Sequence, residues 1–111
     1  MKNAAKSLMR DALACGYKLR VAYDQFNDVG YPTGTSWVQA YEATTDCDQG
    51  YLYLIGAKGL FENEWAFILH GNNDDELICD HVVGGFIDRW QVETDYGQES
   101  MSQEFKQRES I

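Results

Sequence analysis

The chain has 111 residues, of which 44% are hydrophobic and 14% aromatic, so it is too apolar for a disordered protein and long enough for one domain. Nine Lys and Arg face eighteen Asp and Glu, giving a formal net charge of −9. This charge argues against a non-specific nucleic-acid binder, and no run reaches the roughly 20 apolar residues of a membrane helix. The N-terminal stretch carries charges among its apolar residues, unlike a signal peptide. We therefore expect a soluble cytoplasmic protein.

The first third of the chain predicts a helix, a strand and a loop. In residues 3–15 apolar side chains recur at three- and four-residue spacing, which indicates an amphipathic helix, and Gly16 stands where helices often have a C-cap glycine. Residues 17–23 alternate apolar and polar side chains, as a half-buried strand does. Residues 24–34 are rich in turn formers and predict a loop. Its aromatic residues Phe26 and Tyr31 either anchor the loop to the core or are displayed as contacts, and we favour the anchoring interpretation.

The middle of the chain predicts a helix followed by a sheet. Residues 35–45 fit helical spacing, although their composition also permits a strand, and we favour the helix. Residues 51–56, 64–70 and 76–83 read as three strands joined by short turns. Consecutive strands with short connections imply an antiparallel meander.

The end of the chain completes an α+β fold. Phe86, Ile87 and Trp90 fit either a short helix or a last strand that closes the core. We expect residues 1–92 to form a single α+β domain, and residues 93–111 to form a polar C-terminal helix or tail. The predicted fold class is an N-terminal helix plus an antiparallel sheet of about four strands, with one or two further short helices.

The charge is distributed unevenly along the chain. Residues 1–20 carry a balance of +4, whereas residues 21–105 hold sixteen acidic side chains against Lys58 and Arg89. Most of these carboxylates cannot be paired internally, so they are either solvated or directed towards a positive partner, and such a field attracts basic molecules. The alternative is that the charge only maintains solubility.

The acidic residues recur in several segments next to the predicted strands. A face lined by carboxylates could imitate the phosphates of a duplex, which present one charge per about 1.7 Å of axis. The residues we predict to contact a partner are Asp46, Asp48, Glu62, Glu64, Asp74, Asp75 and Glu76. Aromatic side chains between them either fill the core or anchor the partner; these are Trp37, Tyr41, Tyr51, Tyr53, Phe61 and Trp65.

Histidines and acids offer weaker candidates for chemistry. His70, Cys79 and His81 could form a zinc site or an acid–base pair, but strand alternation puts Cys79 and His81 on one face and Asp80 on the other, and no further ligand pair is present. Residues 74–76 could attract a divalent cation, although the EF-hand spacing is missing. The chain contains no nucleophile elbow, P-loop or dinucleotide-binding motif. We therefore predict no enzyme activity and no cofactor.

The three cysteines fit a reducing compartment, because their number is odd and no C-x-x-C pair occurs. Cys15 and Cys79 have apolar neighbours and are expected in the core. Cys47 lies between two Asp residues, which disfavour its thiolate.

Two segments, ALACGYKLRVAYD and EWAFILHGNNDDELICDH, resemble small proteins encoded in phages and prophages. The residues that carry the likeness in the second segment are Trp65, Gly71, Asn72, Asp75, Ile78, Asp80 and His81. The size, acidity and cysteine content also resemble anti-CRISPR and anti-restriction proteins. This second likeness is one of class, and it transfers no residue-level site.

The resemblance implies a non-enzymatic acidic inhibitor of a host-defence nucleic-acid-binding complex, acting in the host cell cytoplasm. Such a protein occupies a basic DNA- or RNA-binding surface of a protein or ribonucleoprotein with its carboxylates, and it contacts neither nucleic acid nor membrane directly. The first alternative is a phage accessory protein with another host or phage protein as target. The second is a small metal-dependent hydrolase that uses His70, Cys79 and His81, and a third is a structural phage component. The basic N-terminal helix could also pair with the acidic face of a second copy in a homodimer.

Overall fold

The computed structural model describes residues 4–23, 29–46, 49–56, 64–70 and 77–110. The helices are α1 (Ala4–Ala14), α2 (Trp37–Asp46), α3 (Phe86–Glu93) and α4 (Gln103–Glu109). The strands are β1 (Lys18–Ala22), β2 (Val29–Gly34), β3 (Gln49–Ile55), β4 (Glu64–Leu69) and β5 (Ile78–His81). The predicted α+β class is confirmed, with five strands in place of about four.

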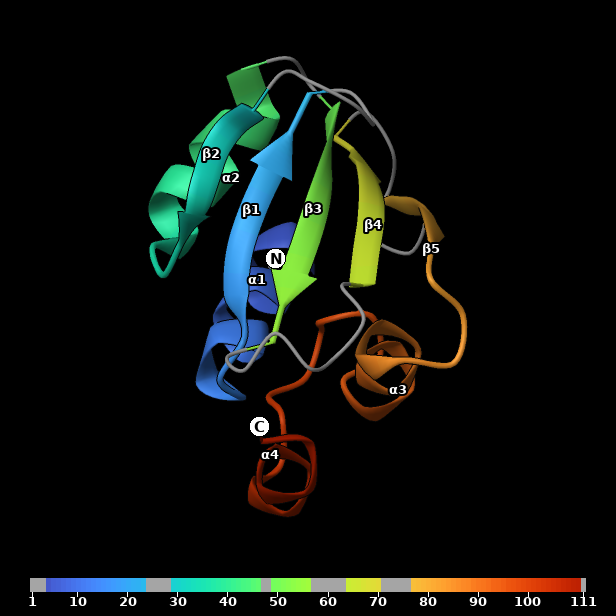
Figure 1. Ribbon diagram of the computed structural model, residues 1–111. Coiled ribbons are helices and arrows are strands. Elements are labelled where there is room, and N and C mark those ends of the chain that lie inside the picture. Colours follow the sequence, from blue (N-terminus) through green and yellow to red (C-terminus); the bar gives the residue numbers. More distant parts are fainter. Residues whose placement is uncertain (1–3, 24–28, 47–48, 57–63, 71–76, 111) are drawn as a thin grey trace.

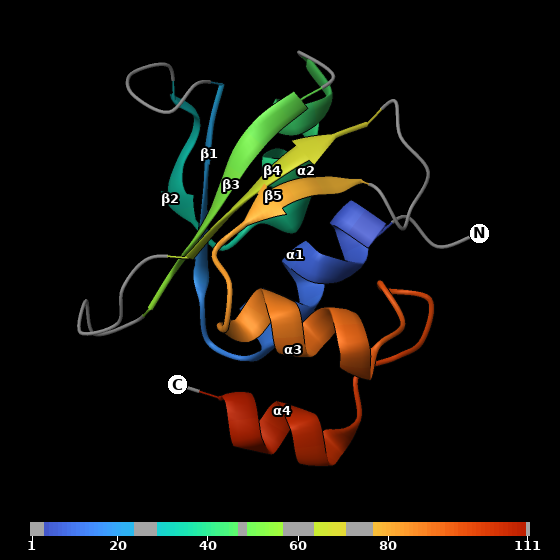
Figure 2. The same ribbon diagram turned by 90° about the vertical axis from the view of Figure 1, so that its right-hand side faces the viewer.

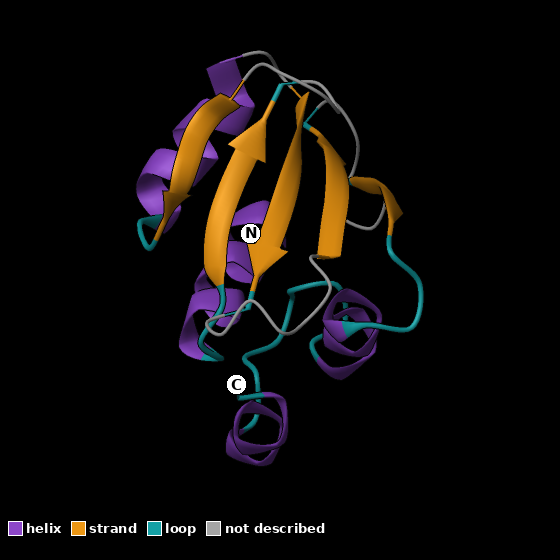
Figure 3. Ribbon diagram, in the orientation of Figure 1, coloured by secondary structure: helices purple, strands orange, loops and turns teal. Residues whose placement is uncertain are grey.

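The strands form one sheet in the order β2-β1-β3-β4-β5, and every neighbouring pair is antiparallel (Figure 1). The predicted meander is present as β3-β4-β5. Helices α1, α2 and α3 lie on one side of the sheet, and α4 lies beneath α3 (Figure 2). In the face-on view, α1 and α2 form the part of this helical layer that lies behind the strands, whereas α3 and α4 lie below them (Figure 3).

The core fills the space between the sheet and this helical layer. In β3 and β4 every second side chain is buried, so Leu52, Leu54, Ala66 and Ile68 point towards the helices. Leu8 of α1 belongs to the same buried cluster. The apolar face of the strands, formed by every second residue, thus packs against the apolar face of the amphipathic helix α1, as the sequence predicts.

The predicted glycine caps the C-terminal end of helix α1. The amide of Gly16 donates to the carbonyl of Leu13, and the amide of Tyr17 donates to the carbonyl of Ala12, each at about 3.1 Å or less. This pair of bonds is a Schellman motif, and its central residue needs a left-handed backbone. Gly16 has φ +100°, which a residue without Cβ adopts at little cost.

The predicted loop over residues 24–34 is wrong in its second half, because residues 29–34 form β2; residues 24–28 lie outside the described residues. Pro32 lacks an amide proton, but β2 is an edge strand, where one side of the ladder needs no partner. Tyr31 packs against the core, and its hydroxyl accepts a hydrogen bond from the amide of Ser36 at 3.1 Å. The anchoring interpretation of Tyr31 is therefore confirmed.

Two ambiguous segments are helical. Residues 35–45 correspond to α2, as favoured, and the segment that holds Phe86 and Trp90 is helix α3 and not a last strand. The predicted turns at residues 57–63 and 71–75 lie outside the described part of the chain.

The C-terminal segment packs on the same core. Ser102 caps α4 by accepting a hydrogen bond from the amide of Phe105 at 3.1 Å. The Phe105 ring is 1% exposed and lies 6.0 Å from the ring of Phe86. Met101 also packs against the buried cluster, next to the Cys15 sulfur. The predicted C-terminal helix is thus joined to the body by apolar contacts.

We expect Phe105→Ala to lower the free energy of unfolding by about 3–5 kcal/mol, because it removes a large ring from the core. Gln107→Ala, at an exposed position of the same helix, is the matched control and should change it by less than about 0.5 kcal/mol. Urea unfolding followed by tryptophan fluorescence measures both. Equal, small effects would show that α4 contributes nothing to the cooperative unit.

Candidate interaction surface

The side of the sheet opposite the helices carries a row of aromatic side chains. Tyr51 and Tyr53 of β3 and Trp65 and Phe67 of β4 alternate with the buried residues and are partly exposed. The Tyr51 ring lies 4.9 Å from that of Phe67 and 5.9 Å from that of Trp65. We call this surface, together with the residues beside it in β1 and β5, the open face.

Charged residues flank the aromatic row on the neighbouring strands. Arg20 of β1 pairs with Tyr53 across the sheet, and its guanidinium lies 5.0 Å from the centre of that ring. Lys18 lies two residues earlier on the same face of β1. Asp80 of β5 pairs with Phe67, and cross-strand partners project to the same side. The open face thus runs from two cations, through four aromatic rings, to one carboxylate.

Three of the six aromatic anchors predicted from the sequence lie on this face. Trp37 and Tyr41 instead pack against the core from α2. Their rings are covered by basic side chains of α1: the Arg10 guanidinium lies 5.7 Å from the Trp37 ring, and the Lys6 ammonium 4.7 Å from the Tyr41 ring. Phe61 lies outside the described residues.

The carboxylate of Glu64, predicted to contact a partner, is used inside the protein. Its side chain is buried, and its two oxygens accept hydrogen bonds from the amides of Phe86 at 2.7 Å and Ile87 at 3.1 Å. These amides begin α3, where helices have unpaired N–H groups and a partial positive charge. Glu64 therefore acts as an N-terminal cap supplied by β4, and the prediction that it belongs to a partner-binding surface is withdrawn.

A glycine makes room for this cap. Gly85 is the N-cap residue of α3, and a Cβ built on it would overlap the Glu64 carboxylate. Gly85 therefore allows a carboxylate from a distant strand to approach the helix end closely.

Most of the other predicted contact residues lie outside the described part of the chain; these are Asp48, Glu62, Asp74, Asp75 and Glu76. Asp46 is the last residue of α2. The register pairs Gln49, which begins β3, with Leu69, which ends β4. The start of β3 and the end of β4 therefore lie together at one end of the sheet, the upper end in Figure 1. The segments that join α2 to β3 and β4 to β5 begin or end there.

The two histidines have separate partners on different helices. The Nε2 atom of His70 lies 2.8 Å from the hydroxyl oxygen of Thr44 in α2, whereas that of His81 lies 2.5 Å from a carboxylate oxygen of Asp88 in α3. Within the described residues, no group of three or more His, Cys, Asp and Glu side chains could hold a metal ion. Cys79, the third residue of the hydrolase hypothesis, is exposed.

The cysteines divide by burial. Cys15 is buried as predicted, and burial together with the nearby Asp11 carboxylate raises the pKa of its thiol to about 11. The prediction that Cys79 is also buried is wrong, because it lies on the short edge strand β5. Cys47 lies outside the described residues. A thiol with a pKa this high is protonated at neutral pH and is a poor nucleophile.

Asp88 joins β5 to the start of α3. One of its carboxylate oxygens accepts a hydrogen bond from the amide of Gly84, and the other contacts His81. The Gly84 amide, followed by the hydrogen bond from His81, lowers the pKa of Asp88 below its ordinary value of 3.8. The folded state therefore favours the ionised carboxylate.

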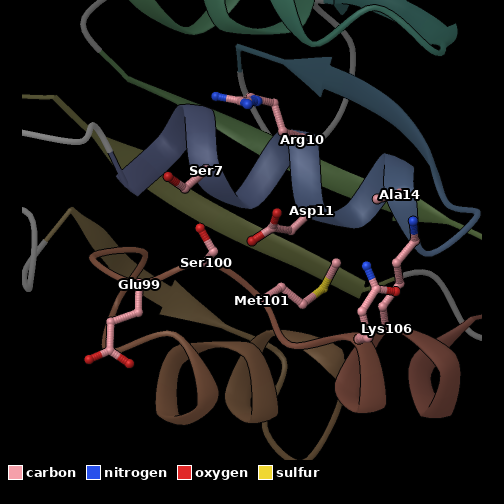
Figure 4. A pocket seen from close by; sticks show the side chains of 9 residues that line it. Ser7, Arg10, Asp11, Ala14, Glu99, Ser100, Met101 and Lys106 are labelled. Carbon is pink, nitrogen blue, oxygen red and sulfur yellow. The ribbon is translucent and has the colours of Figure 1, made fainter.

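A polar cavity of about 280 Å³ lies between α1 and the segment that leads into α4 (Figure 4). Asp11 projects into it and accepts a hydrogen bond from the indole nitrogen of Trp90 at 2.8 Å. Ser7, on its wall, donates to the carbonyl of Gly97 at 3.3 Å. These side chains join α1 to the C-terminal third of the chain, which gives the cavity a structural role.

No family model matches the chain, and no curated protein or solved structure is significantly similar to it. Across the described residues, no helix is long and apolar enough to cross a membrane.

Sequence reasoning left Arg20 and Phe67 out of the candidate site. The signal for Phe67 is present in EWAFIL, where aromatic residues occupy alternate positions of a strand. Arg20 is signalled by the same alternation in KLRVA, which puts it opposite the buried Leu19 and Val21. Only the strand order shows that these two strands flank β3.

We expect Glu64→Gln to lower the free energy of unfolding by about 2 kcal/mol, because a charged acceptor at the start of α3 is lost and an amide group faces backbone N–H donors. Glu42→Gln, at an exposed position of α2, is the control and should change it by less than about 0.5 kcal/mol. Gly85→Ala should be destabilising as well, because its Cβ displaces the same carboxylate. Thermal unfolding by circular dichroism measures all three, and an unaffected Glu64→Gln variant would contradict the capping role.

We expect Asp88→Asn to destabilise the protein at pH 7, with a difference from the wild type that shrinks in acid. A carboxylate whose pKa is lowered by folding stabilises the folded state above its unfolded pKa of about 3.8, and this contribution is lost as the pH falls through the lower folded value. Urea unfolding of both proteins between pH 7 and pH 2.5 measures the effect. A difference that stays constant over this range would contradict it.

Proposed function

We propose that this protein is a non-enzymatic inhibitor that binds a basic, nucleic-acid-binding surface of a larger protein or ribonucleoprotein through its surplus carboxylates. The observation that carries the proposal is the concentration of sixteen acidic residues in positions 21–105, against two basic residues. A surface of this charge attracts a basic groove over a long range and fixes its orientation on contact.

The contacts of the basic residues support this proposal. Among the described side chains, Arg89 donates to both carboxylate oxygens of Glu109, at 2.8 and 2.6 Å. Four other cations lie over aromatic rings; these are Lys6, Arg10, Arg20 and Arg108. Arg108 also lies 3.8 Å from a carboxylate oxygen of Glu109. With nine Lys and Arg against eighteen Asp and Glu, even complete pairing would leave an excess of nine carboxylates that can act on a partner.

The ends of the described elements that adjoin the acid-bearing segments support a single binding region. Asp46, at the end of α2, and the connections that carry Asp48 and residues 74–76 adjoin the same end of the sheet by their places in the chain. Glu62 precedes β4 and therefore adjoins the opposite end, and Glu64 is engaged by α3. We accordingly centre the proposed contact on Asp46, Asp48, Asp74, Asp75 and Glu76.

The proposal predicts a partner that is captured in low salt and displaced by DNA. The immobilised protein is incubated with bacterial lysate treated with nuclease, and bound proteins are identified by mass spectrometry. We expect nucleic-acid-binding proteins that elute between about 0.05 and 0.5 M salt, because screening shortens the range of the attraction. Duplex DNA added in excess should compete for the same proteins.

A pair of charge-reversed variants tests the location of the contact. Replacing Asp74, Asp75 and Glu76 by Lys should reduce capture at least about tenfold. Replacing the exposed residues Glu42, Glu99 and Glu104 by Lys changes the net charge equally and should retain most of it. Capture that persists in high salt, resists DNA competition or ignores the first variant would overturn the proposal.

A further inference from the structure

The open face has a charge pattern that complements itself. Arg20 and Lys18 lie on β1, the aromatic rings occupy the central strands β3 and β4, and Asp80 lies on β5 at the other border of the face. We propose that this face binds a second copy of the same chain, forming a symmetric dimer in which two sheets pack against each other. The proposal is independent of the carboxylate function proposed above.

The order of the strands determines how two copies match. A two-fold axis parallel to the strands, between β3 and β4, places β1 of one copy over β5 of the other and β3 over β4. Each copy then directs Arg20 towards Asp80 of the other, and this contact occurs twice. The tyrosines of β3 meet Trp65 and Phe67 of β4, so aromatic surface is buried at the centre of the interface.

The register along the strands is compatible with these contacts. Arg20, Tyr53 and Trp65 lie in one row across the sheet. Phe67 and Asp80 lie in the next row on the same face, which is about 7 Å further along the strands. Packed sheets are about 10 Å apart, and the long Arg side chain spans a diagonal step of this size.

The composition of the face favours a protein partner over nucleic acid. Trp, Tyr and Arg are the residues that contribute most binding energy in protein interfaces, and they are most effective at the centre of the buried area. A phosphate backbone, in contrast, would be repelled by the net charge of −9 and by the Asp80 carboxylate on the face itself. A second copy supplies both the cation for Asp80 and the carboxylate for Arg20.

A charge-swap experiment tests the dimer. Analytical ultracentrifugation over about 5–500 μM protein, in about 0.15 M salt to screen the overall repulsion, should show a dimer of the 12.7 kDa chain. Arg20→Asp and Asp80→Arg should each weaken dimerisation about 10–100-fold, because each places like charges opposite each other. The double variant should recover an affinity close to that of the wild type, because it restores opposite charges across the interface. If the single variants weakened the dimer only by destabilising the fold, combining them would not restore the affinity.

Two further variants separate the interface from the fold. Trp65→Ser should weaken the dimer at the centre of the face, whereas Glu42→Arg, an exposed charge reversal on α2, should leave it unchanged. Circular dichroism confirms that each variant is folded. A monomer at every concentration, a dimer indifferent to both single reversals, or failure of the double variant to recover would overturn the proposal. Binding of a fluorescent single-stranded oligonucleotide that Trp65→Ser abolishes would likewise overturn it.

Discussion

The burial of the Glu64 carboxylate against the first turn of α3 connects the two halves of the fold. It joins the start of α3 to the first residue of β4. Further along α3, the Trp90 indole donates a hydrogen bond to Asp11 of α1, and the Phe86 ring packs against Phe105 of α4. These contacts hold α1, α3 and α4 together next to the sheet. A buried carboxylate is stable there because two backbone N–H groups and the helix dipole offset the loss of its hydration.

Much of the fold follows from hydrophobic periodicity, and the errors have physical causes. The alternation of YLYLI and EWAFIL predicts β3 and β4, and the helical spacing of the first segment predicts α1. Strand β2 was missed because Gly30, Pro32 and Gly34 are turn formers, which a sheet edge tolerates. Alternation of polar and apolar residues shows that the two faces of a sheet differ, but it does not show which element packs on each face. An acidic residue at the start of a strand, such as Glu64, is therefore expected to be exposed even when it binds the end of a helix.

The candidate site was predictable to a similar degree. Composition alone gives the acidic charge, and three of the four aromatic residues on the open face were among the proposed anchors. Their assembly into one row depends on β3 and β4 being central, and the placement of Arg20 and Asp80 on either side depends on strand order. Such order arises from long-range pairing, which a local pattern does not encode.

The two borders of the sheet have a consequence for how this molecule associates. At one border Pro32 offers no amide proton to an incoming strand, and at the other β5 is only four residues long and its ladder is irregular. Both features disfavour the addition of further strands from neighbouring molecules. Growth of the sheet into fibres by addition of strands is therefore hindered at both borders, and copies of the chain associate more easily through other surfaces.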